Sequence, residues 1–171
     1  NRSWLLMMRS GVLRLEWSAD GTNTIGADAT EFIRVLPDRR MAFRFTLDVN
    51  NGAGGRTIRF YQSDSIDGVW TQVGADVVQA GVTSIFSSNA SVRIGDASTA
   101  GLRQFDGKLY KAEIRNGING TVVANPDLTI QTPGASSFVD GAGRTWTRSA
   151  SVTITNRNIR FKGNVISWPV R

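Results

Sequence analysis

The amino-acid sequence predicts an all-β protein, a two-sheet antiparallel β-sandwich. Apolar and polar side chains alternate over several short segments, as they must in a strand that buries one face. Turn dipeptides such as Asn-Gly and Asp-Gly separate these segments at short intervals, which is typical of sandwiches and barrels. Helical spacing is scarce, and only residues 29–36 could hold one short helical turn.

The alternation predicts which side chains face the core. In the clearest strand the inward residues are Met41, Phe43, Phe45, Leu47 and Val49. The same pattern predicts buried faces at Leu13, Leu15 and Trp17; at Ile58 and Phe60; at Val92 and Ile94; and at Tyr110, Ala112 and Ile114. Weaker strand signals lie at 145–147, 151–155 and 158–162. The residues between these inward positions, such as Arg44, are expected to point outward.

Turn residues divide the predicted strands. Residues 50–55 are rich in Asn and Gly and lie between two clear strands, so we expect a hairpin loop there. Asp-Gly and Asn-Gly pairs tolerate positive φ and favour tight turns. They occur at 20–21, 67–68 and 119–120. Residues 125–143 are richer in Pro, Gly and Ser, and are expected to form a long surface connection.

Composition excludes several kinds of chemistry. The 171 residues include no cysteine and no histidine, which removes disulfides, thiol nucleophiles, the commonest general base and the commonest transition-metal ligand. No apolar run approaches the roughly 20 residues that a membrane-spanning helix needs. The net charge is +6, but the arginines are scattered and only Arg39 and Arg40 are adjacent. We therefore expect a solvated basic surface, with no dedicated nucleic-acid site.

Catalytic residues are equally scarce. A glycosidase needs two cooperating carboxyl groups, and the chain has only Glu16, Glu31 and Glu113 as glutamates. Glu16 and Glu113 lie on outward strand positions beside Arg14 and Arg115, so ion pairing explains both of them. The glycine-rich stretch 52–55 lacks the Gly-Lys-Ser/Thr ending of a phosphate-binding loop. The chain is therefore predicted not to be an enzyme.

The segment 65–70, Ser-Ile-Asp-Gly-Val-Trp, is similar to an Asp-box turn, but it occurs once and is one residue short. We interpret it as a hairpin turn.

A calcium ion needs six to eight oxygen ligands. The sequence has no Asp-x-Asp-x-Asp run, so we expect no cofactor, although the loop aspartates leave a single structural calcium ion open. These aspartates are Asp20, Asp64, Asp67, Asp96, Asp106 and Asp140.

Aromatic side chains are the remaining candidates for ligand binding. The chain has five tryptophans, and Trp17 falls on a predicted core face. Trp70 and Trp146 lie near loops, where an indole could stack on a sugar, although packing in the core is the alternative. Trp70, Trp146 and Asp67 are therefore the candidate ligand-binding residues.

Four blocks of sequence occur in an order that resembles a known family. They are residues 10–22 (SGVLRLEWSADGT), 45–57 (FTLDVNNGAGGRT), 105–120 (FDGKLYKAEIRNGING) and 140–147 (DGAGRTWT). They resemble the concanavalin A-like, laminin G-type jelly-roll modules of secreted actinobacterial proteins and of actinobacterial phage tails. Residues 161–171 (FKGNVISWPVR) are similar to a segment that follows such modules in phage tail proteins.

The resemblance implies a jelly-roll domain over residues 1–156 that lacks its first strand, and a C-terminal extension or connection over 157–171. It implies a non-catalytic structural or adhesion module of a virion tail protein that contacts host-surface glycans. The expected partners are other virion proteins or copies of the same chain, in a homo-oligomer or a longer polypeptide. The alternative is a carbohydrate-binding module of a secreted, extracellular bacterial protein. Neither specific nucleic-acid binding nor membrane insertion is expected.

Overall fold

The computed structural model describes residues 3–34, 39–95, 105 and 107–155, and the chain divides into two compact units, Asn1–Phe105 and Asp106–Arg171. Every regular element in the described residues is a β-strand, and all strand pairs are antiparallel. None of the described residues forms a helix with the length and apolarity needed to cross a membrane. The predicted all-β fold class is confirmed.

The first unit begins with a three-stranded sheet, in which β2 (Val12–Trp17) lies between β1 (Trp4–Arg9) and β3 (Ile25–Asp28). The turn from β1 to β2 has two residues, Ser10 and Gly11, and both have positive φ, at 51° and 81°. Positive φ at both central positions is the geometry of a type I′ turn, whose twist matches that of the flanking strands. Glycine meets this requirement without steric strain.

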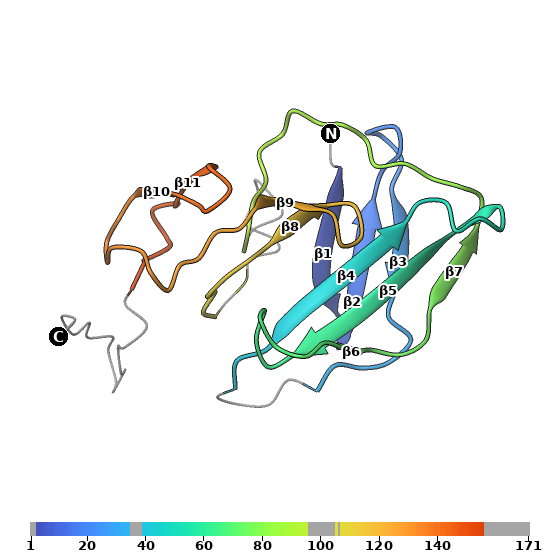
Figure 1. The fold of residues 1–171 in the computed structure, drawn as a ribbon, viewed down its shortest axis with the longest axis horizontal. Helices are drawn as coiled ribbons and strands as arrows, with labels where there is room; N and C mark the ends of the chain where they lie inside the picture. Colours follow the sequence, from blue (N-terminus) through green and yellow to red (C-terminus); the bar gives the residue numbers. More distant parts are fainter. Residues whose placement is uncertain (1–2, 35–38, 96–104, 106, 156–171) are drawn as a thin grey trace. The chain divides into compact units, whose positions relative to one another are not determined.

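The second sheet of this unit is built around its longest strand, β5 (Gly55–Ser63). Every residue of β4 (Ala42–Asp48) pairs with a residue along one edge of β5. β6 (Thr71–Gln72) and β7 (Val77–Ala80) pair with the other edge, at opposite ends of β5. Figure 1 shows this sheet, in cyan and green, in front of the three-stranded sheet in blue.

The loop between β4 and β5 is a hairpin, as the sequence predicts. Asn51 organises it: its backbone N–H donates to the carbonyl of Gly55 at 2.9 Å, and its side-chain oxygen accepts from Ala53 and Gly55 at 3.0 and 3.1 Å. A side chain that binds nearby backbone groups in this way is the usual reason for Asn in turns. The loop fixes the register of β4 against β5.

The two sheets of the first unit enclose one hydrophobic core. Leu13, Leu15 and Trp17 of β2 are 2%, 0% and 1% exposed, and Ile58 and Phe60 of β5 are both 0% exposed. These are the alternating positions predicted to face inward, so the predicted register of both strands is confirmed. Partly buried apolar side chains pack around this centre: Trp4, Leu6, Ile25, Met41, Phe43, Phe45, Leu47 and Val77. Two sheets with a shared core make this unit a β-sandwich.

Polar contacts join the two layers beside the core. The side-chain amide of Gln79 in β7 donates to the carbonyl of Gly26 in β3 at 3.0 Å. The indole N–H of Trp17 donates to the hydroxyl of Thr83 at 3.0 Å, which satisfies the polar atom of a buried ring. The backbone N–H of Phe86 donates to the carbonyl of Ser18 at 2.8 Å. The segment after β7 therefore fastens one sheet to the other.

The second unit contains two short hairpins. β8 (Ile114–Asn116) pairs with β9 (Thr121–Ala124), and β10 (Ser137–Val139) pairs with β11 (Thr145–Thr147). The turn between β8 and β9 includes Asn119 at a φ of 58°, which agrees with the predicted Asn-Gly turn. The strand expected at 145–147 is confirmed.

Several predicted elements are wrong. Val92 and Ile94 are 49% and 37% exposed and form no strand, because alternation produces a strand only where a partner edge supplies hydrogen bonds. Residues 151–155 likewise form no strand, and residues 29–34 form no helical turn. Val49 lies beyond the end of β4 and is 37% exposed.

Other predicted boundaries need smaller corrections. Of the strand expected at Tyr110, Ala112 and Ile114, only Ile114 lies in a strand, and Lys111 makes a single bridge with Asp127. The connection expected over 125–143 contains β10. The strand expected at 158–162 and the extension over 157–171 lie outside the described residues. The single jelly-roll domain over 1–156 stays a prediction.

The two phenylalanines Phe60 and Phe45 should differ in how much their replacement by alanine destabilises the protein. Replacing fully buried Phe60 (Phe60→Ala) should lower the free energy of unfolding by about 3–5 kcal/mol, as large truncations in packed cores do. Phe45→Ala should lower it less, because Phe45 is only half-buried. Urea denaturation followed by circular dichroism measures both. An equal loss for the two variants would contradict the assigned core.

Candidate functional site

The candidate site is the outer face of the four-stranded sheet, the face turned away from the core. Because side chains alternate along a strand, the neighbours of the inward residues of β4 and β5 share this face. They are Arg44, Thr46, Asp48, Thr57, Arg59 and Tyr61. The face is polar and aromatic, in contrast to the apolar face beneath it. We call it the outer face.

Strand register brings three residues of the outer face into one row. Arg44 of β4 lies opposite Tyr61 of β5, and Tyr61 lies opposite Gln72 of β6. Trp70 precedes β6 and lies against the same row, since its ring centroid is 4.8 Å from Cζ of Arg44. The row thus combines a cation, a phenol, an indole and an amide within the spacing of adjacent strands.

Two aromatic rings hold the guanidinium group of Arg44. Its central carbon Cζ is 4.2 Å from the centroid of the Tyr61 ring and 4.8 Å from the centroid of the Trp70 ring. Both distances are within the roughly 6 Å over which a cation is attracted to the face of an aromatic ring. Arginine suits such contacts because its planar group stacks on rings and is weakly hydrated. The rings therefore restrict the orientation of Arg44.

Arg44 has no acceptor within the part of the chain that the structure describes. Its Nε atom is buried and lacks a hydrogen-bond partner, and Arg44 makes no ion pair there. Other arginines of the same unit do have carboxylate partners: Arg14 lies 2.9 Å from Glu16 and Arg59 lies 2.7 Å from Asp76. Buried donors are normally paired, so an unpaired one calls for a structural or functional reason. Arg44 thus differs from Arg14 and Arg59, because it contacts aromatic rings where they contact carboxylates.

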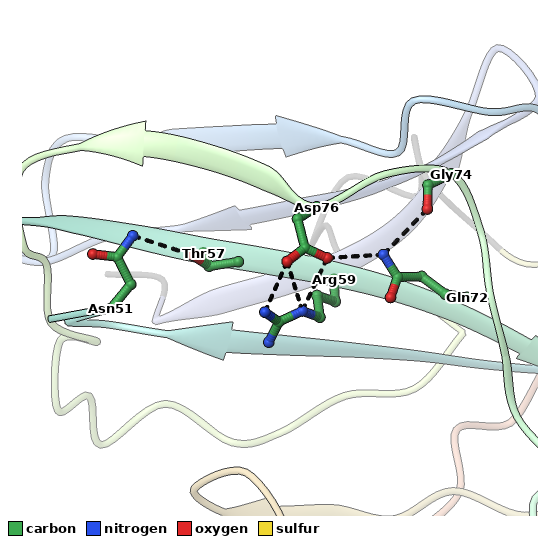
Figure 2. Close-up of polar contacts among 6 residues, drawn as sticks. All are labelled: Asn51, Thr57, Arg59, Gln72, Gly74 and Asp76. Atoms are coloured by element: carbon green, nitrogen blue, oxygen red, sulfur yellow. Dashed lines mark hydrogen bonds and ion pairs between the residues drawn. The ribbon is translucent and has the colours of Figure 1, made fainter. Parts of the chain in front are cut away.

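A polar network next to this row stabilises the edge of the sheet. Arg59 donates from Nε and Nη2 to the two carboxylate oxygens of Asp76, at 2.9 and 2.7 Å. Gln72 donates from its amide to Asp76 at 2.9 Å and to the carbonyl of Gly74 at 3.1 Å (Figure 2). The hydrogen bonds from Arg59, and then those from Gln72, hold the pKa of Asp76 below its usual value. The network neutralises Arg59 and fixes the amide of Gln72.

The far end of the outer face is closed by the hairpin loop. The side-chain amide of Asn51 donates to the hydroxyl of Thr57 at 3.2 Å (Figure 2). Thr57 is only 5% exposed. This end therefore presents no free polar group from Thr57, and the chemistry of the face concentrates around Arg44 and Trp70.

The turn before Trp70 carries the predicted residue Asp67. Asp67 is exposed, and Trp70 is half-buried. The backbone N–H of Gly68 donates to the carbonyl of Ser65 at 3.1 Å, which closes the turn. A Cβ atom at Gly68 would lie 2.6 Å from the hydroxyl of Ser63, so only glycine fits without a shift. The interpretation of this segment as a turn is confirmed, and its role in binding stays a prediction.

Trp146, the third predicted residue, belongs to the second unit and has a structural partner there. Its indole N–H donates to a carboxylate oxygen of Asp140 at 2.8 Å. Asp140 is 7% exposed and also accepts the backbone N–H groups of Asn125, Ala142 and Arg144, each at 2.9 Å. Trp146 and Asp140 thus organise the turn between β10 and β11.

Burial alone would raise the pKa of Asp140. Hydrogen bonds from Arg144, Trp146, Asn125 and Ala142 outweigh it and lower the pKa to about 2. Asp140 therefore stays ionised over a wide pH range. Its charge holds the turn through the hydrogen bonds from Ala142, Arg144 and Trp146.

The glutamates that the sequence associated with arginines do form ion pairs. Glu16 accepts from Arg14 at 2.9 Å, and Arg14 also donates to Asp28 at 2.7 Å. Glu113 accepts from Arg115 at 2.7 Å. The interpretation of both glutamates as ion-pair partners is confirmed, and the absence of catalysis stays a prediction.

The carboxylates of the described residues do not converge on a metal site. Within residues 3–34, 39–95, 105 and 107–155, no three acidic side chains lie together in a way that could hold a metal ion. Asp96 and Asp106, two of the loop aspartates named above, lie outside these residues. The structural calcium ion stays an untested expectation.

Sequence reasoning found Trp70 but missed Arg44 and Tyr61 as its companions. The alternation in β4 does place Arg44 outward, which is the one signal that pointed to it. The pairing of Arg44 with Tyr61 depends on strand register, and the approach of Trp70 depends on the turn before β6.

Comparison of the chain with protein-family models, with curated proteins and with solved structures found no match.

The Asp140 turn generates a prediction about pH. Its folded-state pKa of about 2 is below the ordinary value of 3.8, so its contribution to stability is present above about pH 4 and is lost as the pH falls toward 2. Asp140→Asn should lower the melting temperature at neutral pH and flatten its dependence between pH 4 and 2. It should also speed hydrogen exchange of the Trp146 indole N–H, measured by NMR.

The matched control is Asp64→Asn, which removes the same charge from an exposed loop residue of the first unit. This control should leave the hydrogen-exchange rate of the Trp146 indole N–H unchanged. If the Trp146 indole N–H exchanges as slowly in Asp140→Asn as in the parent chain, Asp140 does not organise the turn.

Proposed function

We propose that this chain is a non-catalytic adhesion module of a phage virion tail protein that contacts glycans on the host surface. The observation that carries the proposal is the row on the outer face, where Arg44 stacks against Tyr61 and Trp70 and has no carboxylate partner among the described residues. A stacked cation beside aromatic rings offers both polar and apolar contacts to a saccharide. A site of a few side chains on one sheet face suits weak contacts repeated over many copies.

The scaffold supports this role. A sandwich with fully buried residues such as Phe60 and Trp17 keeps its outer side chains in fixed positions. The charge of +6 favours approach to the anionic envelope of a bacterium. Weak single contacts add up when modules are linked, because the second contact forms within one assembly. A tail protein present in several copies meets this condition.

The resemblance of four sequence blocks to phage-associated jelly rolls supports the virion setting and the expected partners, which are other virion proteins or copies of this chain. A carbohydrate-binding module of a secreted protein would use the same face, and Trp70 beside the exposed turn of Asp67 favours it as the second candidate. The two candidates differ in the need for multiple copies. A secreted module should bind its sugar measurably as a single chain.

Cell binding tests the proposal. The full chain fused to a trimerisation segment should bind actinobacterial cells at low salt at least about a hundredfold more tightly than the single chain. Binding should fall steeply at about 0.5 M salt, where surface charges are screened. Flow cytometry with a labelled chain measures both, with the trimerisation segment alone as control. If neither form binds cells, the adhesion role is lost and a purely architectural role remains.

Catalysis is tested separately. The chain should release no reducing ends from bacterial polysaccharides, because Glu16 and Glu113 are each engaged in an ion pair with an arginine, whereas a glycosidase needs two cooperating carboxyl groups. A sensitive reducing-sugar assay over about a day measures this. Turnover that disappears in Glu16→Gln or Glu113→Gln would show that the chain is an enzyme.

A further inference from the structure

We infer that Arg44 and Trp70 form a binding site for acidic saccharides, in which Arg44 binds a carboxylate or phosphate group and Trp70 packs against the attached sugar ring. The inference rests on the proposed glycan contact and names its ligand class. It places recognition in a single row of the outer face and excludes neutral sugars as its best ligands.

The unused donors of Arg44 favour an anionic ligand. A guanidinium group carries five N–H donors and no acceptor. In the described residues none of these donors has a partner, and only Nε is buried, so the two terminal nitrogens reach solvent. Two parallel N–H groups at the end of an arginine match the two oxygens of a carboxylate or phosphate. An oxyanion is therefore the group that this side chain is prepared to bind.

Stacking fixes Arg44 before any ligand arrives. The rings of Tyr61 and Trp70 lie 4.2 and 4.8 Å from its Cζ atom. A long side chain that is already ordered loses less conformational freedom on binding. The fixed orientation also explains why the guanidinium group stays in the row without a carboxylate to hold it.

The surrounding charges leave the positive charge of Arg44 available. Asp76, a carboxylate of the same face, is paired with Arg59 at 2.7 Å. Asp48 lies four residues further along β4, about 13 Å away at the usual rise of a strand. Asp67 has an interaction of its own. Arg44 is therefore the cation of this face that an incoming anion can neutralise.

The rings make a saccharide a better ligand than a bare anion. Trp70 is half-buried, and its indole combines an apolar surface with a polar tip. Gln72, in the same row, uses its amide N–H groups for Asp76 and Gly74, which fixes its carbonyl oxygen as an acceptor for hydroxyl groups. A sugar ring offers apolar C–H groups and hydroxyls side by side, so it complements both residues.

Single-stranded nucleic acid also combines anions with stacking groups, but the face fits it less well. Such proteins combine a basic groove along the backbone with several exposed rings. Here Asp76 neutralises Arg59, so the outer face does not present a row of unpaired cations for a nucleic-acid backbone. An oligonucleotide therefore serves as a competing ligand in the test.

Titration of the full chain by NMR and calorimetry tests the inference with four probes: trigalacturonate, mannose 6-phosphate, the neutral methyl ester of trigalacturonate and a short oligothymidylate. Trigalacturonate and mannose 6-phosphate should shift the Trp70 indole and Arg44 side-chain resonances. The methyl ester should bind at least about tenfold more weakly, because it lacks the charge-assisted hydrogen bonds. The ratio of the two acidic ligands tells whether carboxylate or phosphate is preferred.

Variants locate the site. Arg44→Gln should weaken trigalacturonate binding about tenfold or more, and Arg44→Lys should recover only part of this loss because lysine keeps the charge but not the planar fork. Arg9→Gln removes the same charge from an exposed residue of β1 and should change the affinity less than about twofold. Trp70→Phe keeps a ring and should bind better than Trp70→Ala. Melting curves confirm that each variant is folded.

Three results would overturn the inference: equal binding of the ester and the acid, equal losses in Arg44→Gln and Arg9→Gln, or tighter binding of the oligonucleotide at the same ionic strength. These results are distinct from failure of the proposed function. Trigalacturonate binding without cell binding would leave the site and remove the adhesion role. Cell binding that is unchanged in trimeric Arg44→Gln would leave the adhesion role and remove the site.

Discussion

The packing of β2 against β5 is the interaction on which the first unit depends. Leu15 and Trp17 from one sheet and Ile58 and Phe60 from the other are shielded almost completely from solvent. Because β5 alternates, burying Ile58 and Phe60 forces Arg59 and Tyr61 onto the opposite face. The position of the candidate site is thus a consequence of the core. Any slip of one residue in β5 would exchange the two sets of side chains.

The sequence predicts the centre of the sandwich well, and for a physical reason. Alternation at Leu13, Leu15 and Trp17 indicates that one face of the strand is buried. The Asn-rich loop 50–55 has residues that readily adopt the backbone conformations of a hairpin turn. The same alternation at Val92 and Ile94 misleads. A strand needs a partner edge, and a partner is a property of the fold that no local pattern contains.

The candidate site was predictable only in part. Trp70 stands out because it is an aromatic residue beside a turn. Arg44 is one of 17 arginines, and nothing in its sequence neighbours distinguishes it from paired arginines such as Arg14. Its distinction is the proximity of two rings without a carboxylate, which depends on register and on the path of the chain after Ser65. Trp146 shows the converse, because its partner Asp140 gives it a structural role that composition did not reveal.

The site also lies on a strand with a free side. Among the described strands β4 pairs only with β5, so the backbone groups along its other side are not part of a ladder. Exposed strand edges invite pairing with other chains, and charged side chains on the edge strand are a common protection against it. Arg44 and Asp48 are such charges. A change that makes this strand wholly apolar would therefore endanger the solubility of the protein as well as its surface chemistry, which ties recognition to protection against aggregation in one short stretch of chain.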